Sequence, residues 1–314
     1  MDVCTTAGRR TLAPGVEFAG ISLAFDGEPV LDDVSLDVPA GRTTVLMGPS
    51  GVGKTTLIRT LLGLYTPDSG AVLVDGRAVG DLRPDELMTL RRGMGVLLGG
   101  QSVYESSLFG SLSVFDNVAC ALTAAGVGAS EAAARTWRIL HEFDLAESAE
   151  RPPVQLSAGE RRRTALAKAL VADPVLLVLD DPGPALDLLN RDEVVRTIDR
   201  HRRRTGATCV LVTHDIDVAR TLGDHLAVLL DGEIVAAGEP AELLDGVHTA
   251  DEFDDRFGFR GRFSRAAPSE TADAARRARR QGLVMAWLLM GVLIAITVAL
   301  GTVLASGILD NPAT

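Results

Sequence analysis

Gly48-Pro-Ser-Gly-Val-Gly-Lys-Thr-Thr56 is the stretch of sequence that decides the fold of this chain. It fits the pattern G-x-x-x-x-G-K-[ST], in which glycines let backbone N–H groups turn inward around phosphate oxygens. Lys54 can then reach the β- and γ-phosphates of a nucleoside triphosphate, and Thr55 can hold Mg²⁺. A plain glycine-rich turn before a helix is the alternative. The residues expected to bind the triphosphate are Gly48, Pro49, Ser50, Gly51, Val52, Gly53, Lys54, Thr55 and Thr56.

This loop stands between a strand and a helix, as the pattern requires. Residues 43–47 are β-branched or apolar and predict a buried strand, and Lys54–Leu62 repeats apolar residues at helical spacing. Further apolar strands at 175–179 and 208–212 indicate an α/β core with a central sheet. Two alternating segments, Val16–Phe25 and Val30–Val38, flank the turn sequence Asp26-Gly-Glu-Pro and predict an added antiparallel sheet.

The rest of the chain divides by composition. Residues 99–172 have a helical pattern, which predicts an inserted α-helical subdomain within a domain that spans residues 14–245. Residues 246–281 are charged and weakly patterned, so we expect a linker there, partly helical before the segment that follows it.

An uncharged segment, Leu283–Ala305, follows that linker. As a helix it rises roughly 34 Å, enough to cross a hydrocarbon core of about 30 Å. The basic run Arg276–Arg280 precedes it and favours the cytoplasmic side. We therefore expect one transmembrane helix at 283–305 that anchors the protein at the cytoplasmic face of the cell membrane, with a short external tail, 306–314. A buried core helix is the alternative.

Charge and cysteine content exclude other classes of protein. The formal net charge is −11 and the pI about 5.0, which argues against a main role in binding nucleic acid. Cys4, Cys120 and Cys209 are scattered without metal-ligand spacing, which predicts structural thiols in a reduced compartment.

Two carboxylates follow the apolar strand at 175–179. Asp180 is the candidate ligand for Mg²⁺ beside the phosphate-binding loop, and Asp181 can face the attacking water. A pair of aspartates at a strand end is a weak signal by itself, but it gains weight in a chain that also carries the phosphate-binding loop.

The sequence Leu156-Ser-Ala-Gly-Glu160 forms a capping box at the start of a helix expected at Arg161–Val171. A capped helix start with a glycine-containing turn is also a site for phosphate. With this motif, residues 16–244 resemble the ATP-binding-cassette (ABC) family of transport ATPases. That resemblance implies an ABC-type P-loop NTPase fold, a dimer formed with a second copy or a related cassette, and a signature turn that contacts ATP bound to the opposite subunit. The signature residues are Ser157, Ala158, Gly159 and Glu160.

The same resemblance assigns roles to four more residues. Phe25 lies where an aromatic residue stacks on adenine, and Asp187 lies in a segment that resembles the D-loop. His214 resembles the switch histidine that senses the γ-phosphate. Gln101 is the candidate for the glutamine that senses both the metal and the permease, although Tyr104 could occupy that place instead.

Three departures from the family pattern bear on catalysis. Asp181 stands where the family usually has glutamate, Ala158 and Glu160 stand where glycine and glutamine are usual, and the loop that carries Gln101 is expanded. They place the catalytic rate in doubt more than the binding of ATP and Mg²⁺, so we expect slow turnover.

The resemblance implies a subunit that hydrolyses ATP to power transport through a separate membrane permease. The loops 107–117 and 213–224 look like those of Mla/Mce-type lipid or sterol transporters, although other ABC transporters remain an alternative. A second class of function is a membrane-anchored, nucleotide-dependent switch with little hydrolysis, which Asp181 and the altered signature favour. A soluble cassette for translation or DNA repair is disfavoured by the acidic charge and the expected membrane span.

Overall fold

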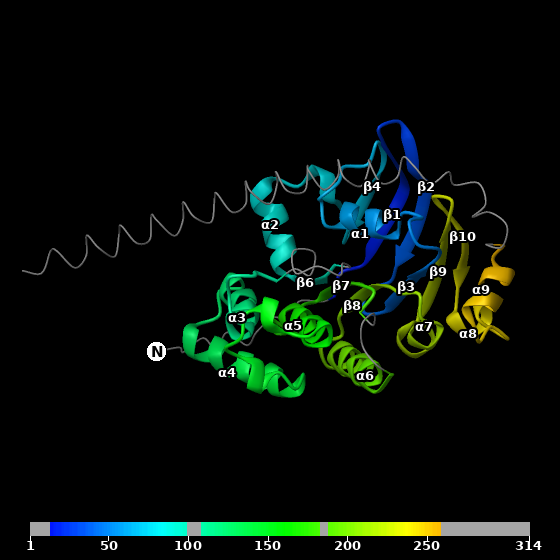
Figure 1. Cartoon of the computed structure of the whole chain (residues 1–314). Helices are drawn as coiled ribbons and strands as arrows, with labels where there is room; N and C mark the ends of the chain where they lie inside the picture. The colour runs from blue at the N-terminus through cyan, green and yellow to red at the C-terminus, as the bar shows by residue number, and fades with distance from the viewer. Residues whose placement is uncertain (1–12, 99–107, 183–187, 259–314) are drawn as a thin grey trace, which may run out of the picture. The chain divides into compact units, whose positions relative to one another are not determined.

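A computed structural model describes residues 13–98, 108–182 and 188–258 of the chain. The chain divides into two units, Met1–Phe257 and Gly258–Thr314. Every helix and strand described below lies in the first unit, which Figure 1 shows in colour.

A six-stranded sheet forms the centre of this unit, in the order β10-β9-β3-β8-β7-β6. Its first five strands along the chain run parallel, and β10 pairs antiparallel with β9. Every residue of β3, β7 and β8 is buried, which explains why these strands are continuous apolar runs instead of alternating ones. The strands are β3 (Thr43–Met47), β6 (Met94–Leu97), β7 (Leu176–Asp180), β8 (Thr208–Val212), β9 (His225–Leu230) and β10 (Glu233–Gly238).

A second, antiparallel sheet has the order β2-β1-β4-β5. Its first two strands meet at Asp26 and Gly27, whose φ angles of 52° and 86° suit a tight hairpin. The predicted antiparallel addition to the α/β core is therefore present. The strands are β1 (Val16–Phe25), β2 (Glu28–Val38), β4 (Ser69–Val74) and β5 (Arg77–Ala78).

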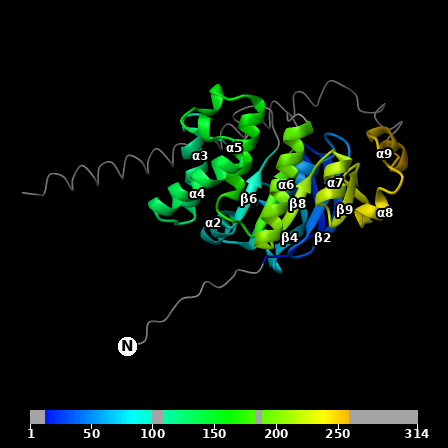
Figure 2. The same cartoon turned by 90° about the horizontal axis from the view of Figure 1, so that it is seen from below.

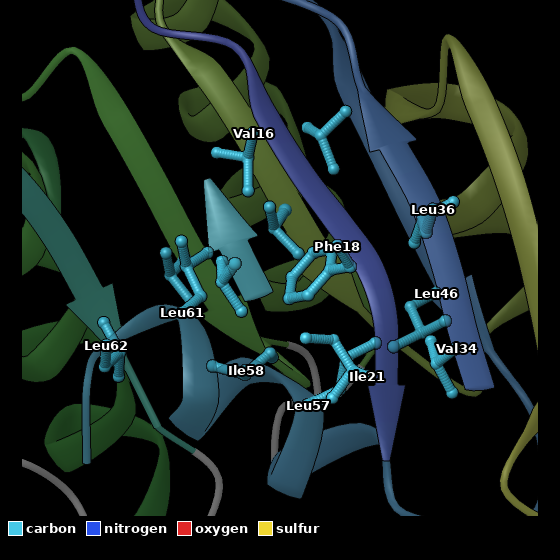
Figure 3. Packing of buried hydrophobic residues seen from close by; sticks show 14 of the residues in the cluster. Val16, Phe18, Ile21, Val34, Leu36, Leu46, Leu57, Ile58, Leu61 and Leu62 are labelled. Atoms are coloured by element: carbon cyan, nitrogen blue, oxygen red, sulfur yellow. The ribbon is translucent and has the colours of Figure 1, made fainter. Parts of the chain in front are cut away.

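Helix α1 (Lys54–Leu61) contributes to an apolar cluster that includes residues of both sheets (Figure 3). Leu57, Ile58 and Leu61 of this helix are fully buried against Phe18 and Ile21 of β1. Burial of a leucine or isoleucine side chain stabilises a fold by about 1.5–3 kcal/mol, so this cluster fixes the helix that follows the phosphate-binding loop.

Helices α5, α6 and α7 cover the opposite face of the larger sheet, as Figures 1 and 2 both show. Helix α5 also packs on α3, α4 and β6, so it connects the helical subdomain to the sheet. The helices of the subdomain are α3 (Val114–Ala124), α4 (Ala129–Glu142) and α5 (Ala158–Leu170), and those that follow are α6 (Leu188–Thr205) and α7 (Ile216–Leu222). Helix α5 begins at Ala158 instead of the expected Arg161, because Ser157 itself is the N-cap.

Other short elements differ from the sequence expectations. Helix α2 (Pro84–Arg92) was not predicted, and it begins with proline at N1 and a glutamate at N3. Helix α9 (Ala250–Arg256) lies inside the expected linker 246–281, near its start. Thr249 and Glu252 form its capping box, and Phe253 is buried. The remaining helix is α8 (Pro240–Leu243), and short 3₁₀ turns lie at Val79–Asp81, Ala146–Ser148 and Pro153–Gln155.

Within the residues that the structure describes, no helix has the length and apolarity needed to cross a bilayer. The expected transmembrane helix at 283–305 and the tail 306–314 lie outside those residues.

Candidate active site

The phosphate-binding loop connects β3 to α1, and two of its glycines are required by the backbone. Gly48 has a φ of 145°, and a Cβ there would lie 2.1 Å from the Leu229 carbonyl oxygen. Gly53 has a φ of 108° and caps α1, and a Cβ there would lie 2.9 Å from the Val30 carbonyl oxygen. Both conformations are open to glycine alone without strain, so the loop can turn its N–H groups inward at the N-terminus of α1.

Lys54 is the first residue of α1 and is only 5% exposed. Its Nζ donates hydrogen bonds to the carbonyl oxygens of Gly48 at 2.8 Å and Pro49 at 2.6 Å. Burial lowers the pKa of this ammonium to about 8, while the charges of Asp180 and Asp181 act in the opposite direction. The group is therefore still mostly cationic at pH 7 and is held at the loop that is expected to take phosphates.

Thr55 and Asp180 meet although they come from different elements. The Thr55 hydroxyl on α1 donates to Asp180 Oδ2 at 2.9 Å. Asp180 ends β7 and is 5% exposed. A hydroxyl and a carboxylate are the hard oxygen ligands that Mg²⁺ prefers, so these two residues fit a magnesium ion that also binds nucleotide phosphates.

Asp181 follows β7 and is half-buried. Its backbone N–H donates to the Val212 carbonyl oxygen at 2.8 Å, and its φ is 51°, in the left-handed region. Burial raises the pKa of the carboxyl to about 6, with Arg162 opposing that rise and Asp180 adding to it. A carboxylate with a pKa near neutrality can accept a proton from water, as a general base must.

Arg162 is a residue of this site that the sequence reasoning missed. It lies in the second turn of α5 and is 6% exposed. Its Nη2 donates to the carbonyl oxygens of Asp180 (2.7 Å) and Asp181. The signal was available in the sequence, because Arg162 shares a helical face with Ala165, Leu166 and Ala169, all of them buried, and a charge on an apolar face requires a partner.

His214 follows β8, next to the strand that ends in Asp180. Partial desolvation and the nearby charge of Lys54 lower the pKa of its imidazole, whereas Asp180 opposes this. The histidine therefore lies within electrostatic range of both groups. The next residue, Asp215, caps α7 and forms an ion pair with Arg191 at 2.5 Å, which holds the start of this loop.

Phe25 ends β1 and is 39% exposed, as a platform for a planar ligand must be. Its ring lies edge-on to Tyr65, with 5.2 Å between ring centroids. Arg59 of α1 donates to the Tyr65 hydroxyl at 3.2 Å. These contacts connect the expected adenine-stacking residue to the helix that begins at the phosphate-binding loop.

Two residues of the signature turn, Ser157 and Glu160, form a capping box with each other. Ser157 Oγ accepts from the Glu160 N–H at 3.2 Å, and Glu160 Oε2 accepts from the Ser157 N–H at 2.8 Å. Ser148 also donates to Glu160 Oε1 at 2.8 Å. The bonds from Ser157 and Ser148 lower the pKa of Glu160 to about 2, so the unusual glutamate serves as an ionised helix cap.

Gln101 and Asp187 lie outside the described residues, as does Tyr104. Their predicted roles therefore stay predictions. The other predicted site residues come from β1, the loop before α1, the first turn of α1, the start of α5 and the ends of β7 and β8.

Comparisons with known proteins identify the family of this chain. A family model described as ABC transporter matches residues 31–183. The spermidine/putrescine import ATP-binding protein PotA of Salmonella typhimurium is 35% identical over 237 residues, which cover 75% of this chain and 60% of that protein. The PotA protein of Escherichia coli K12 is also 35% identical, over 236 residues. The chain thus spans about 60% of the length of these curated relatives.

Solved structures of ATP-binding cassettes also match this chain, and the matches cover a larger share of those proteins. The dimeric post-hydrolysis state of the ATP-binding cassette MJ0796, bound to ADP and Pi, matches with a TM-score of 0.66 and 30% identity. The match covers 72% of this chain and 98% of that one. The cbiO1 protein of Clostridium perfringens, part of the cbiONQ transporter complex, matches with a TM-score of 0.64 and 26% identity, over 78% of this chain and 95% of that one. The chain therefore belongs to the family of ATP-binding cassettes of ABC transporters.

Proposed function

We propose that this protein is the ATP-binding and ATP-hydrolysing subunit of an ABC importer and that it powers transport through a separate permease. The observation that carries the proposal is the contact between Thr55 and Asp180, which joins the phosphate-binding loop to the carboxylates at the end of β7. The relatives support it, because PotA is named as an import ATP-binding protein and cbiO1 as part of a transporter complex.

Each residue then has a defined chemical task. Lys54 binds the β- and γ-phosphates, and Thr55 and Asp180 hold Mg²⁺, which neutralises charge on the phosphates. Asp181 accepts a proton from the attacking water, and His214 contacts the γ-phosphate from the end of the neighbouring strand. Phe25 stacks on adenine. Gln101 senses the metal and the permease, and Asp187 belongs to the D-loop.

We propose that two cassettes, identical or related, form the working unit. In such a dimer Ser157, Ala158, Gly159 and Glu160 contact the ATP that is bound to the opposite subunit. The dimeric state of MJ0796 supports this arrangement. The N-terminus of α5 is suited to an anion, because its N–H groups and the helix dipole favour negative charge there.

Polyamines and lipids are the two candidate classes of substrate. The relatives at 35% identity are named for spermidine and putrescine import, so they give no support to a lipid substrate. The prediction of a lipid or sterol depends on the loops 107–117 and 213–224 alone. We propose import by an ABC permease and leave the two substrate classes to experiment.

We further propose that residues 283–305 anchor the cassette at the cytoplasmic face of the membrane. An anchor raises the effective concentration of the ATPase beside its permease without any new contact between them.

A nucleotide-dependent switch with little hydrolysis is the second candidate function. Asp181 favours it, because the aspartate side chain is one methylene shorter than the usual glutamate and its carboxylate retreats by roughly 1 Å, a misplacement that can cost about 100-fold in rate.

One experiment separates the two candidates. The full chain is solubilised from membranes with the proteins that accompany it, and phosphate release from ATP is measured beside an Asp181→Asn variant. Turnover that the variant loses supports the transport ATPase, and ATP binding without turnover in both proteins supports the switch. Proteins and small molecules that co-purify identify the permease and decide between polyamine and lipid.

A further inference from the structure

Arg162 connects three segments that handle the nucleotide in the proposed function. Its guanidinium donates to the carbonyl oxygens of Asp180, at 2.7 Å, and of Asp181, both at the end of β7. A longer contact, 3.5 Å, joins its Nη1 to the carbonyl oxygen of Leu98, directly after β6. The side chain itself starts from α5, five residues after Ser157.

The geometry suits arginine and no smaller cation. Leu98 and Asp181 lie just past the ends of β6 and β7, and Asp180 is the last residue of β7. Buried carbonyl groups at these strand ends need donors. A planar guanidinium carries five N–H donors in a fixed fork, so one side chain can serve carbonyls of two neighbouring strands. The carbonyl oxygens of Leu98 and Asp180 belong to such neighbours, because β6 and β7 pair in parallel.

Electrostatic attraction to two carboxylates also holds the Arg162 side chain in place. Arg162 is buried, and the carboxylates of Asp180 and Asp181 are its electrostatic partners. A buried cation that loses its partners is strongly disfavoured, so α5 cannot shift far from the end of β7 unless the Arg162 contacts move with it. The start of α5 and the backbone of Asp181 are thereby mechanically coupled.

We propose that Arg162 is a positioning residue that holds the Asp181 carboxylate in its productive place and transmits the position of the signature helix α5 to it. This inference rests on the proposed function, since it assigns Arg162 a role in ATP hydrolysis. Arg162 does not contact the reacting atoms in this account. It acts through the backbone and the carboxylate of Asp181.

The test compares Arg162→Gln and Arg162→Lys with the wild-type full chain. Dissociation constants for ATP, single-turnover hydrolysis rates and melting temperatures are measured for each protein. We expect Arg162→Gln to lower the hydrolysis rate by about 10–100-fold, because a displacement near 1 Å has that effect, while the dissociation constant for ATP stays within about threefold. Arg162→Lys keeps the charge but loses the planar set of N–H donors, so its hydrolysis rate should lie between those of wild type and Arg162→Gln.

Arg202→Gln is the matched control. Arg202 is also a largely buried arginine, and it pairs with Asp224 at 2.7 Å and with Asp199 at 3.3 Å, in a region that contributes no residue to the site. This variant should lower the melting temperature and leave the hydrolysis rate of the folded protein unchanged. A purely structural Arg162 would behave in the same way as this control.

A double-mutant cycle with Asp181→Asn tests whether Arg162 affects the hydrolysis rate through Asp181. If Arg162 acts through Asp181, Arg162→Gln should lower the residual rate of the Asp181→Asn protein by less than about twofold. Equal losses in both backgrounds, or a rate of Arg162→Gln within about twofold of wild type, would overturn the inference. Should Arg162→Gln fail to fold, a wild-type rate in Arg162→Lys would overturn it equally. Absence of hydrolysis in the wild-type chain is a different result, because it contradicts the proposed function itself.

Discussion

Thr55 donates to Asp180 at 2.9 Å across a separation of 125 residues in the chain. The contact joins the first turn of α1 to the end of β7, two elements that the parallel pairing of β3, β8 and β7 brings to the same edge of the sheet. Carboxyl ends of parallel strands meet at one edge, which is where open α/β sheets bind ligands. The contact supports our proposal that the two residues share one magnesium ion with a nucleotide.

The first prediction concerns that metal. Asp180→Asn removes the charged ligand, so the gain in ATP affinity that Mg²⁺ gives should shrink and turnover should fall by at least about 100-fold. The measurement is ATP binding with magnesium and with a chelator, for wild type and variant. Binding in the chelator should be alike in the two proteins. An unchanged magnesium effect in the variant would remove Asp180 from the metal site.

The second prediction concerns the buried ammonium of Lys54. Lys54→Ala deletes a cation that makes charge-assisted hydrogen bonds, and such bonds to charged partners contribute about 1.5–3 kcal/mol each, which is roughly 10–100-fold in affinity. We expect that loss in a titration with ATP. Lys168→Met is the matched control, because Lys168 lies over the Phe109 ring at 4.3 Å, away from the phosphate-binding loop. Equal ATP affinity in Lys54→Ala and wild type would contradict the assignment of the loop.

The sequence predicts most accurately the strands that consist of apolar residues throughout. The bounds of β3 and β8 agree with the runs at 43–47 and 208–212, because strands buried on both faces must be apolar throughout. It missed α2, whose contact with the core depends on two partly buried leucines, Leu87 and Leu90, in an otherwise mostly polar helix, and it gave no bounds for α9, which is short and acidic.

Some residues of the candidate site can be predicted from the sequence and others cannot. The residues of the phosphate-binding loop were found because they are contiguous in a fixed pattern. The apolar face of α5 indicates that Arg162 needs a partner, but it does not identify that partner, because the carbonyls of Asp180 and Leu98 are backbone groups that no residue pattern marks. The glutamate at Glu160 read as a departure from the family, yet it forms a capping box with Ser157 that its local sequence does predict.

The third prediction concerns His201, a 95% buried imidazole on α6. Burial lowers its pKa from 6.5 to about 4, with Asp173 opposing this and Arg204 adding to it. The unfolded chain therefore binds a proton at this residue below about pH 6.5, while the folded protein does not until about pH 4. Stability should fall across this window as the pH is lowered, by roughly 3 kcal/mol for the full shift.

Replacement of His201 checks that sign. In His201→Gln the fall in the free energy of unfolding between pH 6.5 and 4, measured by urea titration, should be smaller than in wild type. His141→Gln, at an exposed position on α4, should keep the wild-type pH dependence. A wild-type slope in His201→Gln would show that other groups carry the acid sensitivity.

The fourth prediction concerns the C-terminal segment. Deletion of Leu283–Thr314 should release the protein from membranes and leave ATP affinity unchanged, because the predicted site residues all precede Leu283 and all described elements lie in the unit Met1–Phe257. The measurements are membrane fractionation and ATP titration of both forms. In intact cells, a thiol label at the C-terminus should be reached from outside. A truncated protein that aggregates or loses ATP would identify the segment as part of the core.

The last prediction concerns the length of the catalytic side chain. Asp181 has a φ of 51° and a carbonyl held by Arg162, so its backbone has little freedom to move the carboxylate closer to water. The missing methylene of glutamate then costs roughly 1 Å of reach, and a positioned general base contributes about 10²–10⁴-fold to the rate. Lys54, Thr55 and Asp180 are unaffected, so ATP binding should be normal. We expect slow basal hydrolysis, and an Asp181→Glu variant that is faster with the same ATP affinity, both measured as phosphate release under saturating ATP and magnesium. Asp181→Asn is the control that should lose turnover. A brisk wild-type rate that falls in Asp181→Glu would show that the site is built around aspartate, with the left-handed backbone at Asp181 already supplying the reach that the side chain lacks.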